Sequence, residues 1–428
     1  MEQNLFLNSA SARTLYEEYA SCAPIVDYHN HLSVGDIASD RKFNNLYELW
    51  LAPDPYKHRL MRICGVPEEY ITGKAEPYEK FERFCTVFPT LLGNPVYDWS
   101  VMELSHVFGI EHPINAENAR AIYDEVNEKL CSSEFSANAI LSRFKIVYQS
   151  PVATLCDDLS LFDGKTLCPS LRGDELLAPS ADLRERLHTL TGIAAADRAS
   201  YLRAVGVMLD SFDAKGCRFA DHALDAGFFE ADTDGAKAEM LRLLGAEYAK
   251  RGWTLLLHVD AKRQTSDRLR TLAGPAGGYA CVGGRFNLSA LCDLLGDMER
   301  GGGLSDTVIF PLNMGDMAPL AVMQGSFSED HVASKVQLGP AWWWCDHAIG
   351  IRHTLEAISS FGVLSRFIGM TTDSRSILSF VRHDYFRRIL CNFLAEQNAR
   401  ACRPLTHAEL GAITERICYQ NAWDKIKR

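Results

Sequence analysis

The chain has 428 residues, of which 47% are hydrophobic and 23% charged, so it can bury a core larger than that of one small domain. Its formal net charge is −11, which argues against nucleic acid or an anionic membrane as the main partner. No uninterrupted apolar run is long enough to span a membrane, and the N-terminal segment lacks the basic and apolar regions of a signal peptide.

Thirteen cysteines, an odd number without a Cys-x-x-Cys pair, are typical of a reducing compartment rather than of a disulfide framework. We therefore expect a cytoplasmic protein. The sequence leaves open whether the chain forms a homo-oligomer.

Short apolar segments recur along the chain and predict β-strands, and amphipathic segments such as 236–252 and 348–362 predict helices between them. Alternating strands and helices indicate a parallel sheet, and eight such strands predict a distorted (β/α)8 barrel of the TIM type. The expected strands cover residues 24–29, 144–149, 166–170, 216–222, 254–260, 307–313, 335–339 and 366–373.

The segment from about residue 35 to residue 140 is too long for one crossover and is rich in helix-forming residues. We expect it to be a mainly helical insertion after the first strand. A helical C-terminal tail is expected after residue 376. Both are expected to belong to one metal-dependent barrel domain that comprises residues 1–428.

Polar residues end the first and the last expected strands. Side chains alternate along a strand, so Asp27, His29 and His31 are expected on one face. Strands 1 and 8 are neighbours in a closed barrel, and Asp373 ends strand 8, so it should face the two histidines at the catalytic end of the barrel. The sequence therefore predicts a divalent metal site at His29, His31 and Asp373, with Zn²⁺ a natural fit. Asp373 as the N-cap of the next helix is a compatible alternative.

Arginines lie in or near four of the expected strands, at Arg172, Arg218, Arg263 and Arg375. A guanidinium group binds a carboxylate with two hydrogen bonds. Taken singly, each arginine is better explained as a solvated or structural ion-pair residue. Four arginines at one barrel mouth would favour a substrate with a carboxylate and several hydroxyls. Three tryptophans at 342–344 follow strand 7, and we expect at least two of them to pack in the core.

Several longer motifs match one family. The most specific is "TTDSRSILSFVRHDYFRRIL" at 371–390, and "FNNLYELWL", "YKHRLMRICGV", "GCRFADH" and "KVQLGPAWWW" add to it. On these motifs the chain resembles the uronate isomerases (glucuronate isomerases) of the amidohydrolase superfamily over nearly its whole length. Such enzymes interconvert aldouronates and ketouronates, for example D-glucuronate and D-fructuronate, or D-galacturonate and D-tagaturonate. The resemblance implies a hexuronate substrate.

The resemblance also implies roles for particular residues. His29, His31 and Asp373 would bind or adjoin the metal. Proton transfer would pass through a cis-enediol, with Asp373 the candidate base at C2 and Tyr56 a candidate shuttle between O1 and O2.

Further residues are implied or proposed as substrate contacts. Arg172 and Arg375 would contact the sugar acid by the resemblance, and His58, Arg263 and Trp342 are additional candidates.

Two positions depart from the family pattern. Pro55 stands where a substrate-binding histidine is expected, and Gly315 stands where an arginine is expected. His58 is the nearest candidate to compensate for the first change, and Lys262 and Arg263 are the nearest for the second.

Two other functions are compatible with these residues. One is a metal-dependent hydrolase of the same superfamily. His258 is available on strand 5, but the sixth expected strand ends in Asn313, so the pattern fits a mononuclear site at most. The other is a sugar-acid binder without catalytic activity.

Overall fold

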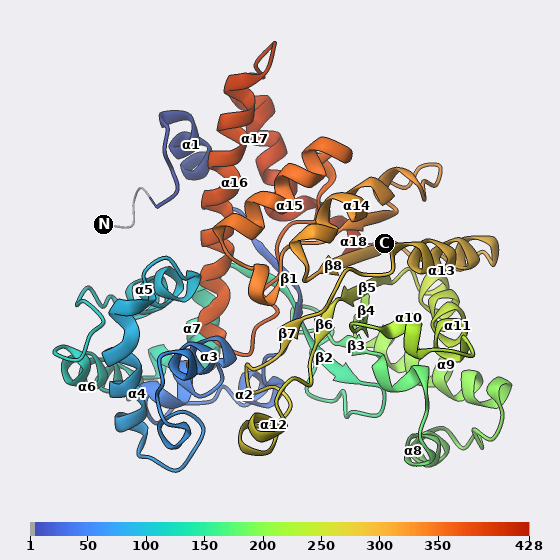
Figure 1. The fold of residues 1–428 in the computed structure, drawn as a ribbon, viewed down its shortest axis with the longest axis horizontal. Coiled ribbons are helices and arrows are strands. Elements are labelled where there is room, and N and C mark those ends of the chain that lie inside the picture. The colour runs from blue at the N-terminus through green and yellow to red at the C-terminus, as the bar shows by residue number, and fades with distance from the viewer. Residues whose placement is uncertain (1–4, 428) are drawn as a thin grey trace.

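The fold is built on a curled parallel sheet of seven strands in the order β1-β2-β3-β4-β5-β8-β9, surrounded by helices (Figure 1). It is seen in a computed structural model that describes residues 5–427. The strands of the sheet are β1 (Ile25–Asn30), β2 (Ile146–Thr154), β3 (Ser170–Arg172), β4 (Phe219–Leu224), β5 (Thr254–Val259), β8 (Thr307–Pro311) and β9 (Val336–Leu338).

The strands are buried on both faces, as expected for a parallel sheet covered by helices. All residues of β1, β5, β8 and β9 are buried. Seven of the eight predicted strands are confirmed, each within a few residues of its expected place. Neighbouring strands run in the same direction, so their carboxyl ends meet at one end of the barrel.

The eighth predicted strand is an extended segment without a regular ladder. It still lies against β1, since the Asp373 amide donates to the His29 carbonyl at 3.1 Å and the His31 amide donates to the Ser374 carbonyl at 2.8 Å. Gly369 and Asp373 have φ values of 87° and 47°, which are incompatible with a continuous strand. The segment nevertheless places Asp373 beside the end of β1.

Asp27 is not part of the cluster of the two histidines, although the sequence places it on the same face of the strand. Its carboxylate accepts hydrogen bonds from Thr371 Oγ1 at 2.9 Å and from Thr372 N and Oγ1 at 2.6 and 2.8 Å. The register of β1 against β2 shifts after Asp27, which breaks the simple alternation. The buried Asp27 therefore ties β1 to the last segment of the barrel.

Helices fill the long connections, and the predicted insertion and C-terminal tail are both helical. The insertion helices α2 to α7 gather on one side of the sheet, next to the long helix α16 (Figure 1). No helix in the described range 5–427 combines the length and apolar character needed to cross a membrane. The helices are α1 (Ala10–Leu15), α2 (Val34–Ala38), α3 (Pro55–Ile63), α4 (Pro77–Val87), α5 (Pro95–Phe108), α6 (Ala119–Leu130), α7 (Ala137–Leu141), α8 (Ala181–Thr191), α9 (Arg198–Ala214), α10 (Phe228–Ala231), α11 (Ala236–Lys250), α12 (Asp267–Ala273), α13 (Leu288–Arg300), α14 (Met317–Val322), α15 (Ala348–Phe361), α16 (Val381–Arg400), α17 (His407–Glu415) and α18 (Asn421–Ile426).

A flap, residues 261–283, connects β5 to the next barrel unit. It contains α12 and the short antiparallel pair β6 (Ala261–Lys262) and β7 (Cys281–Val282). Arg59 of α3 donates hydrogen bonds to the carbonyls of Gly278 and Ala280 at 3.4 and 3.3 Å. The flap is thereby fastened to helix α3 of the insertion.

Candidate active site

A cavity of about 390 Å³ lies where the carboxyl ends of the strands meet the insertion and the flap. The barrel contributes His29, His31, Arg172, His258 and Asp373 to its wall. Helix α3, the flap and the tryptophan loop at 342–344 supply most of the remaining wall. Such a concave site with a few convergent polar groups is typical of a small-molecule site in a barrel enzyme.

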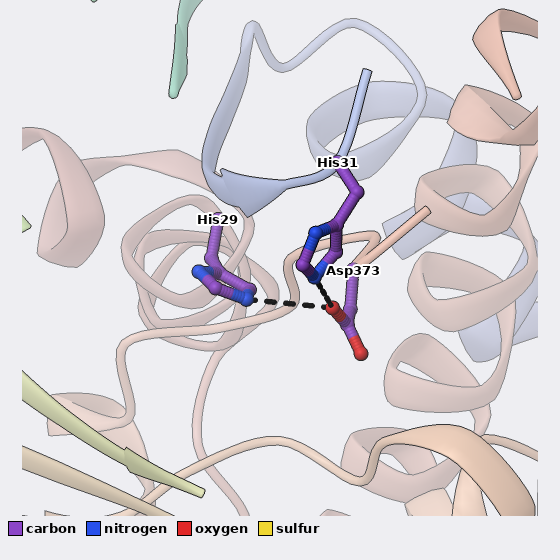
Figure 2. A group of neighbouring side chains, drawn as sticks. All are labelled: His29, His31 and Asp373. Atoms are coloured by element: carbon purple, nitrogen blue, oxygen red, sulfur yellow. Dashed lines mark ion pairs between the residues drawn. The ribbon is translucent and has the colours of Figure 1, made fainter. Parts of the chain in front are cut away.

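The two histidines converge on one carboxylate oxygen (Figure 2). Nε2 of His31 lies 3.1 Å from Oδ1 of Asp373, and Nε2 of His29 lies 3.4 Å from the same atom. One ligand atom from each of the three residues lies within 4.8 Å of the others. The structure thus brings together the three residues that the sequence predicts as metal ligands.

Several buried polar atoms of these three residues lack hydrogen-bond partners, as expected at a site for a divalent ion. Both ring nitrogens of His29 and Oδ2 of Asp373 are buried and have no hydrogen-bond partner within the described chain. Buried polar atoms without partners are costly, so a group that bonds to them is expected. Two imidazoles and a carboxylate are suitable ligands for a divalent metal ion. The cluster can therefore hold such an ion.

The charges around the cluster also favour a cation. Burial alone would raise the pKa of Asp373, but His29 and His31 outweigh it and hold that pKa well below its usual range. Burial lowers the pKa of His31 to about 4, so its ring is neutral near pH 7 and free to act as a ligand. At His29, burial is outweighed by Asp221 and Asp373, which raise the pKa. The surroundings of His29 thus favour a positive charge.

A second buried group adjoins the His29, His31 and Asp373 cluster, and its carboxylate, Asp221, was missed in the sequence. His258 on β5 and Asp221 on β4 form a 2.5 Å hydrogen bond through His258 Nδ1, which leaves His258 Nε2 without a partner in the described structure. With His29, they form a second set of ligand atoms within 4.8 Å of one another. A charged residue inside the apolar run of β4 was the available signal for Asp221, because such a carboxylate is rarely buried without a partner.

Helix α3 carries Tyr56 into the cavity. Asp54 caps this helix, accepting from the amides of Tyr56 and Lys57 at 2.9 and 3.2 Å, and Pro55 occupies the first helical position, which suits proline. The Tyr56 ring is held edge-on by Trp99 and Trp344, with centroid distances of 5.7 and 5.5 Å. A rigid phenol therefore faces the cavity.

Three of the four predicted arginines line the cavity, but their bonding differs. Arg172 is held by Asp174 and Asp221 at 2.7 and 2.5 Å. Arg375 is exposed and forms no ion pair with any described residue. Among the three arginines of the cavity wall, it is the one without a carboxylate partner in the described structure.

Arg263 and Arg218 complete the set. Arg263 pairs with Asp225 at 2.9 Å, and its guanidinium carbon lies 4.9 Å from the centroid of the Trp343 ring. Arg218 precedes β4 and bonds to Asp213 and to the Ile426 carbonyl at 3.0 and 3.3 Å. It therefore lies at the opposite end of the barrel, and the expectation that it shares the mouth is wrong.

Of the two remaining candidate substrate contacts, Trp342 lines the cavity and His58 does not. Trp342 lines the cavity and packs against His258, with ring centroids 4.6 Å apart. His58 is buried on α3 but does not line the cavity. The structure therefore does not bring His58 into position to replace the histidine absent at Pro55.

The space beside Gly315 is taken by Arg285. A Cβ atom at position 315 would lie 2.6 Å from the guanidinium carbon of Arg285, which also pairs with Asp316 at 3.1 Å. Residue 285 thus places a cation beside Gly315, whereas of Lys262 and Arg263 only Arg263 lines the cavity. Arg285 does not line the cavity.

The fold and the site define a barrel enzyme whose cavity places a cluster suited to a divalent metal beside the exposed Arg375. A family model described as glucuronate isomerase matches residues 1–240 and 230–425, and the chain belongs to this uronate isomerase family. The enzyme isomerises uronates, converting an aldose form to a ketose form, and a hexuronate is its substrate.

Individual relatives agree over the full length. The uronate isomerase of Caldanaerobacter subterraneus subsp. tengcongensis is 35% identical over 99% of this chain and 98% of the relative. That of Haemophilus influenzae (strain PittGG) is 34% identical over 100% of this chain and 99% of the relative. The crystal structure of a Thermotoga maritima uronate isomerase is 26% identical, covers 99% of both chains and superimposes with a TM-score of 0.90.

Proposed function

We propose that this enzyme interconverts D-glucuronate and D-fructuronate, D-galacturonate and D-tagaturonate, or both pairs, at the cavity between the barrel and the flap. The observation that carries the proposal is the placement of the His29, His31 and Asp373 cluster in one cavity with Arg375, which has no ion-pair partner in the described structure. A sugar acid needs a reactive centre and an anion site, and the cluster and Arg375 are the candidates for these two roles.

His29, His31 and Asp373 are proposed to hold the divalent ion, and Zn²⁺ is the ion we expect. When bound, such an ion polarises and positions substrate oxygens. Arg375 is proposed to bind the sugar carboxylate, with Arg172 assisting through the part of its guanidinium that faces the cavity. Arg263 and Trp342 are proposed as further contacts because both line the same cavity.

The chain's own groups account for the proton movements. Asp373 takes the proton from C2 of the open-chain aldose and returns it to C1. Tyr56 gives its hydroxyl proton to O1 and recovers a proton from O2, so the tyrosine is regenerated in each turnover. The substrate loses hydrogens from C2 and O2 and gains hydrogens at C1 and O1, which balances the conversion of aldose to ketose.

A cytoplasmic location is proposed from the cysteines. All thirteen are free thiols in the described structure, as suits a reducing compartment.

Incubation of the purified protein with D-glucuronate and with D-galacturonate tests the proposal directly. Ketouronate should form from at least one of them, and the ratio of kcat/KM values defines the preferred substrate. The Asp373→Asn variant is the control for contaminating activity. If neither sugar is converted, the assignment of these substrates is wrong, and a wider set of uronates must be tried.

A further inference from the structure

Arg382, in the first turn of α16, is a buried cation next to the active-site wall. Its side chain is only 1% exposed, and it is among the largest fully buried side chains of the described structure. It does not line the cavity, whereas Tyr56, which it contacts, does. An arginine is rarely buried to this degree unless hydrogen bonds satisfy its charge.

Two aromatic rings lie against this guanidinium group, and its ion pair with the nearest carboxylate is long. Its central carbon lies 3.9 Å from the centroid of the Trp99 ring and 4.8 Å from that of the Tyr56 ring. Its Nη1 lies 3.8 Å from Oδ2 of Asp346, which is beyond hydrogen-bond length. Nε and Nη1 have no hydrogen-bond partner among residues 5–427. A purely structural arginine would be expected to saturate its donors.

The surrounding charges keep Arg382 ionised. Burial opposes the charge, but Tyr56, Asp346, Asp54 and Glu103 together outweigh it and raise its pKa. Arg382 in turn affects the pKa of Tyr56. Burial raises the pKa of Tyr56, Asp373, Asp346 and Asp54 raise it further, and Arg382 is the one neighbour among the main influences that lowers it.

We infer that Arg382 is a positioning residue for Tyr56: its cation, held against the ring, stabilises the phenolate through which proton transfer between O1 and O2 passes. A cation close to an aromatic ring is attracted to it, and this attraction grows when the ring carries negative charge. The inference rests on the proposed role of Tyr56. Arg382 acts through the tyrosine and does not touch the substrate.

A double-mutant cycle tests this coupling. Wild type, Arg382→Met, Tyr56→Phe and the double variant are assayed on the uronate that the wild type converts, with folding checked by thermal melting. We expect Arg382→Met to lower kcat roughly 10- to 100-fold with KM changed less than about threefold, because only the phenolate-like state loses its cation. In the Tyr56→Phe background the same substitution should change kcat less than about threefold.

Two further variants separate charge from packing. Arg382→Lys keeps the cation and should retain kcat within about tenfold of wild type, whereas Arg382→Gln, which replaces the Met variant if that protein does not fold, should be as slow as the Met variant. Arg388→Met is the matched control, since Arg388 is buried on the same helix and stacks on the Tyr16 ring at 4.5 Å, away from the cavity. Its kcat should stay at the wild-type value.

The outcomes are distinct. Equal losses from Arg382→Met with and without the Tyr56 hydroxyl, or a Lys variant as slow as the Met or Gln variant, overturn the inference while leaving uronate isomerisation intact. A wild-type protein that converts no uronate instead overturns the proposed function.

Discussion

His31 Nε2 lies 3.1 Å from Asp373 Oδ1, although these residues come from opposite ends of the barrel sequence. The pair exists only when the last segment of the barrel lies against β1, where the Asp373 amide bonds to the His29 carbonyl. Closure of the barrel and assembly of the His29, His31 and Asp373 cluster are therefore one event. A ligand that bonds both residues should stabilise the closed barrel.

Removal of the metal should therefore lower both activity and stability. A ligand present at a hundredfold excess over its dissociation constant stabilises a folded protein by about 2.7 kcal/mol, so chelator treatment should reduce the unfolding midpoint and Zn²⁺ should restore it. Elemental analysis of wild type, His31→Asn and His58→Gln provides the comparison. The first variant should lose metal and the second should keep it, and equal metal content in all three proteins would contradict the proposed site.

Substitution of Asp373 by asparagine should reduce kcat more than about 10²-fold, since a positioned acid–base group contributes on that scale. The circular dichroism spectrum should be unchanged, because asparagine fills nearly the same space. Asp157→Asn is a suitable control, as Asp157 lines the cavity but is not part of the cluster. A near-wild-type rate for Asp373→Asn would remove this residue from the mechanism.

Much of this site follows from sequence because a parallel barrel converts strand ends into neighbours. The positions of His29, His31 and Asp373 needed only the strand order and the general location of barrel active sites. Arg218 shows the limit of the same reasoning. A few residues of error in the start of a strand move a side chain from one end of the barrel to the other.

Contacts between elements without a repeating pattern could not be predicted. Asp27 bonds to the last segment, at a point where the register of β1 against β2 becomes irregular, and strand alternation shows neither feature. Arg285 reaches Gly315 from a separate loop, and Arg382 reaches Tyr56 from the C-terminal helix. Each contact depends on the packing of whole elements rather than on local periodicity.

Two arginines of the cavity wall should differ in what their loss affects. Arg375 should affect substrate binding, and Arg172 should affect both binding and stability. Arg375→Ala should raise KM for the uronate about ten- to a hundredfold, the usual effect of losing a charge-assisted hydrogen bond. Arg172→Ala should also lower stability by about 3–5 kcal/mol, because Asp221 would remain buried without its cation. Kinetics on the uronate and on its neutral parent hexose, with urea unfolding, measure both effects.

The selectivity for the uronate over the neutral hexose tests whether Arg375 binds the carboxylate. If Arg375→Ala discriminates between the acid and the hexose as well as wild type does, Arg375 does not bind the carboxylate. Equal stability of Arg172→Ala and wild type would show that Asp221 is compensated in another way.

His58 should control stability at acid pH rather than turnover. Burial lowers the pKa of its ring from 6.5 to about 4. Between these values the unfolded chain binds a proton at His58 and the folded chain does not, so the contribution is complete above pH 6.5 and is lost as the pH falls toward 4. The loss amounts to about 3 kcal/mol, at roughly 1.4 kcal/mol per pH unit. The variant His58→Gln should lose correspondingly less stability than wild type in urea unfolding across this range.

The kcat/KM of His58→Gln should stay within about threefold of wild type, because His58 does not line the cavity. The exposed His188→Gln is the control, since it removes an imidazole from the surface rather than from the interior. An unchanged slope in His58→Gln, or a large loss of kcat/KM, would show that His58 is not the buried neutral group described here.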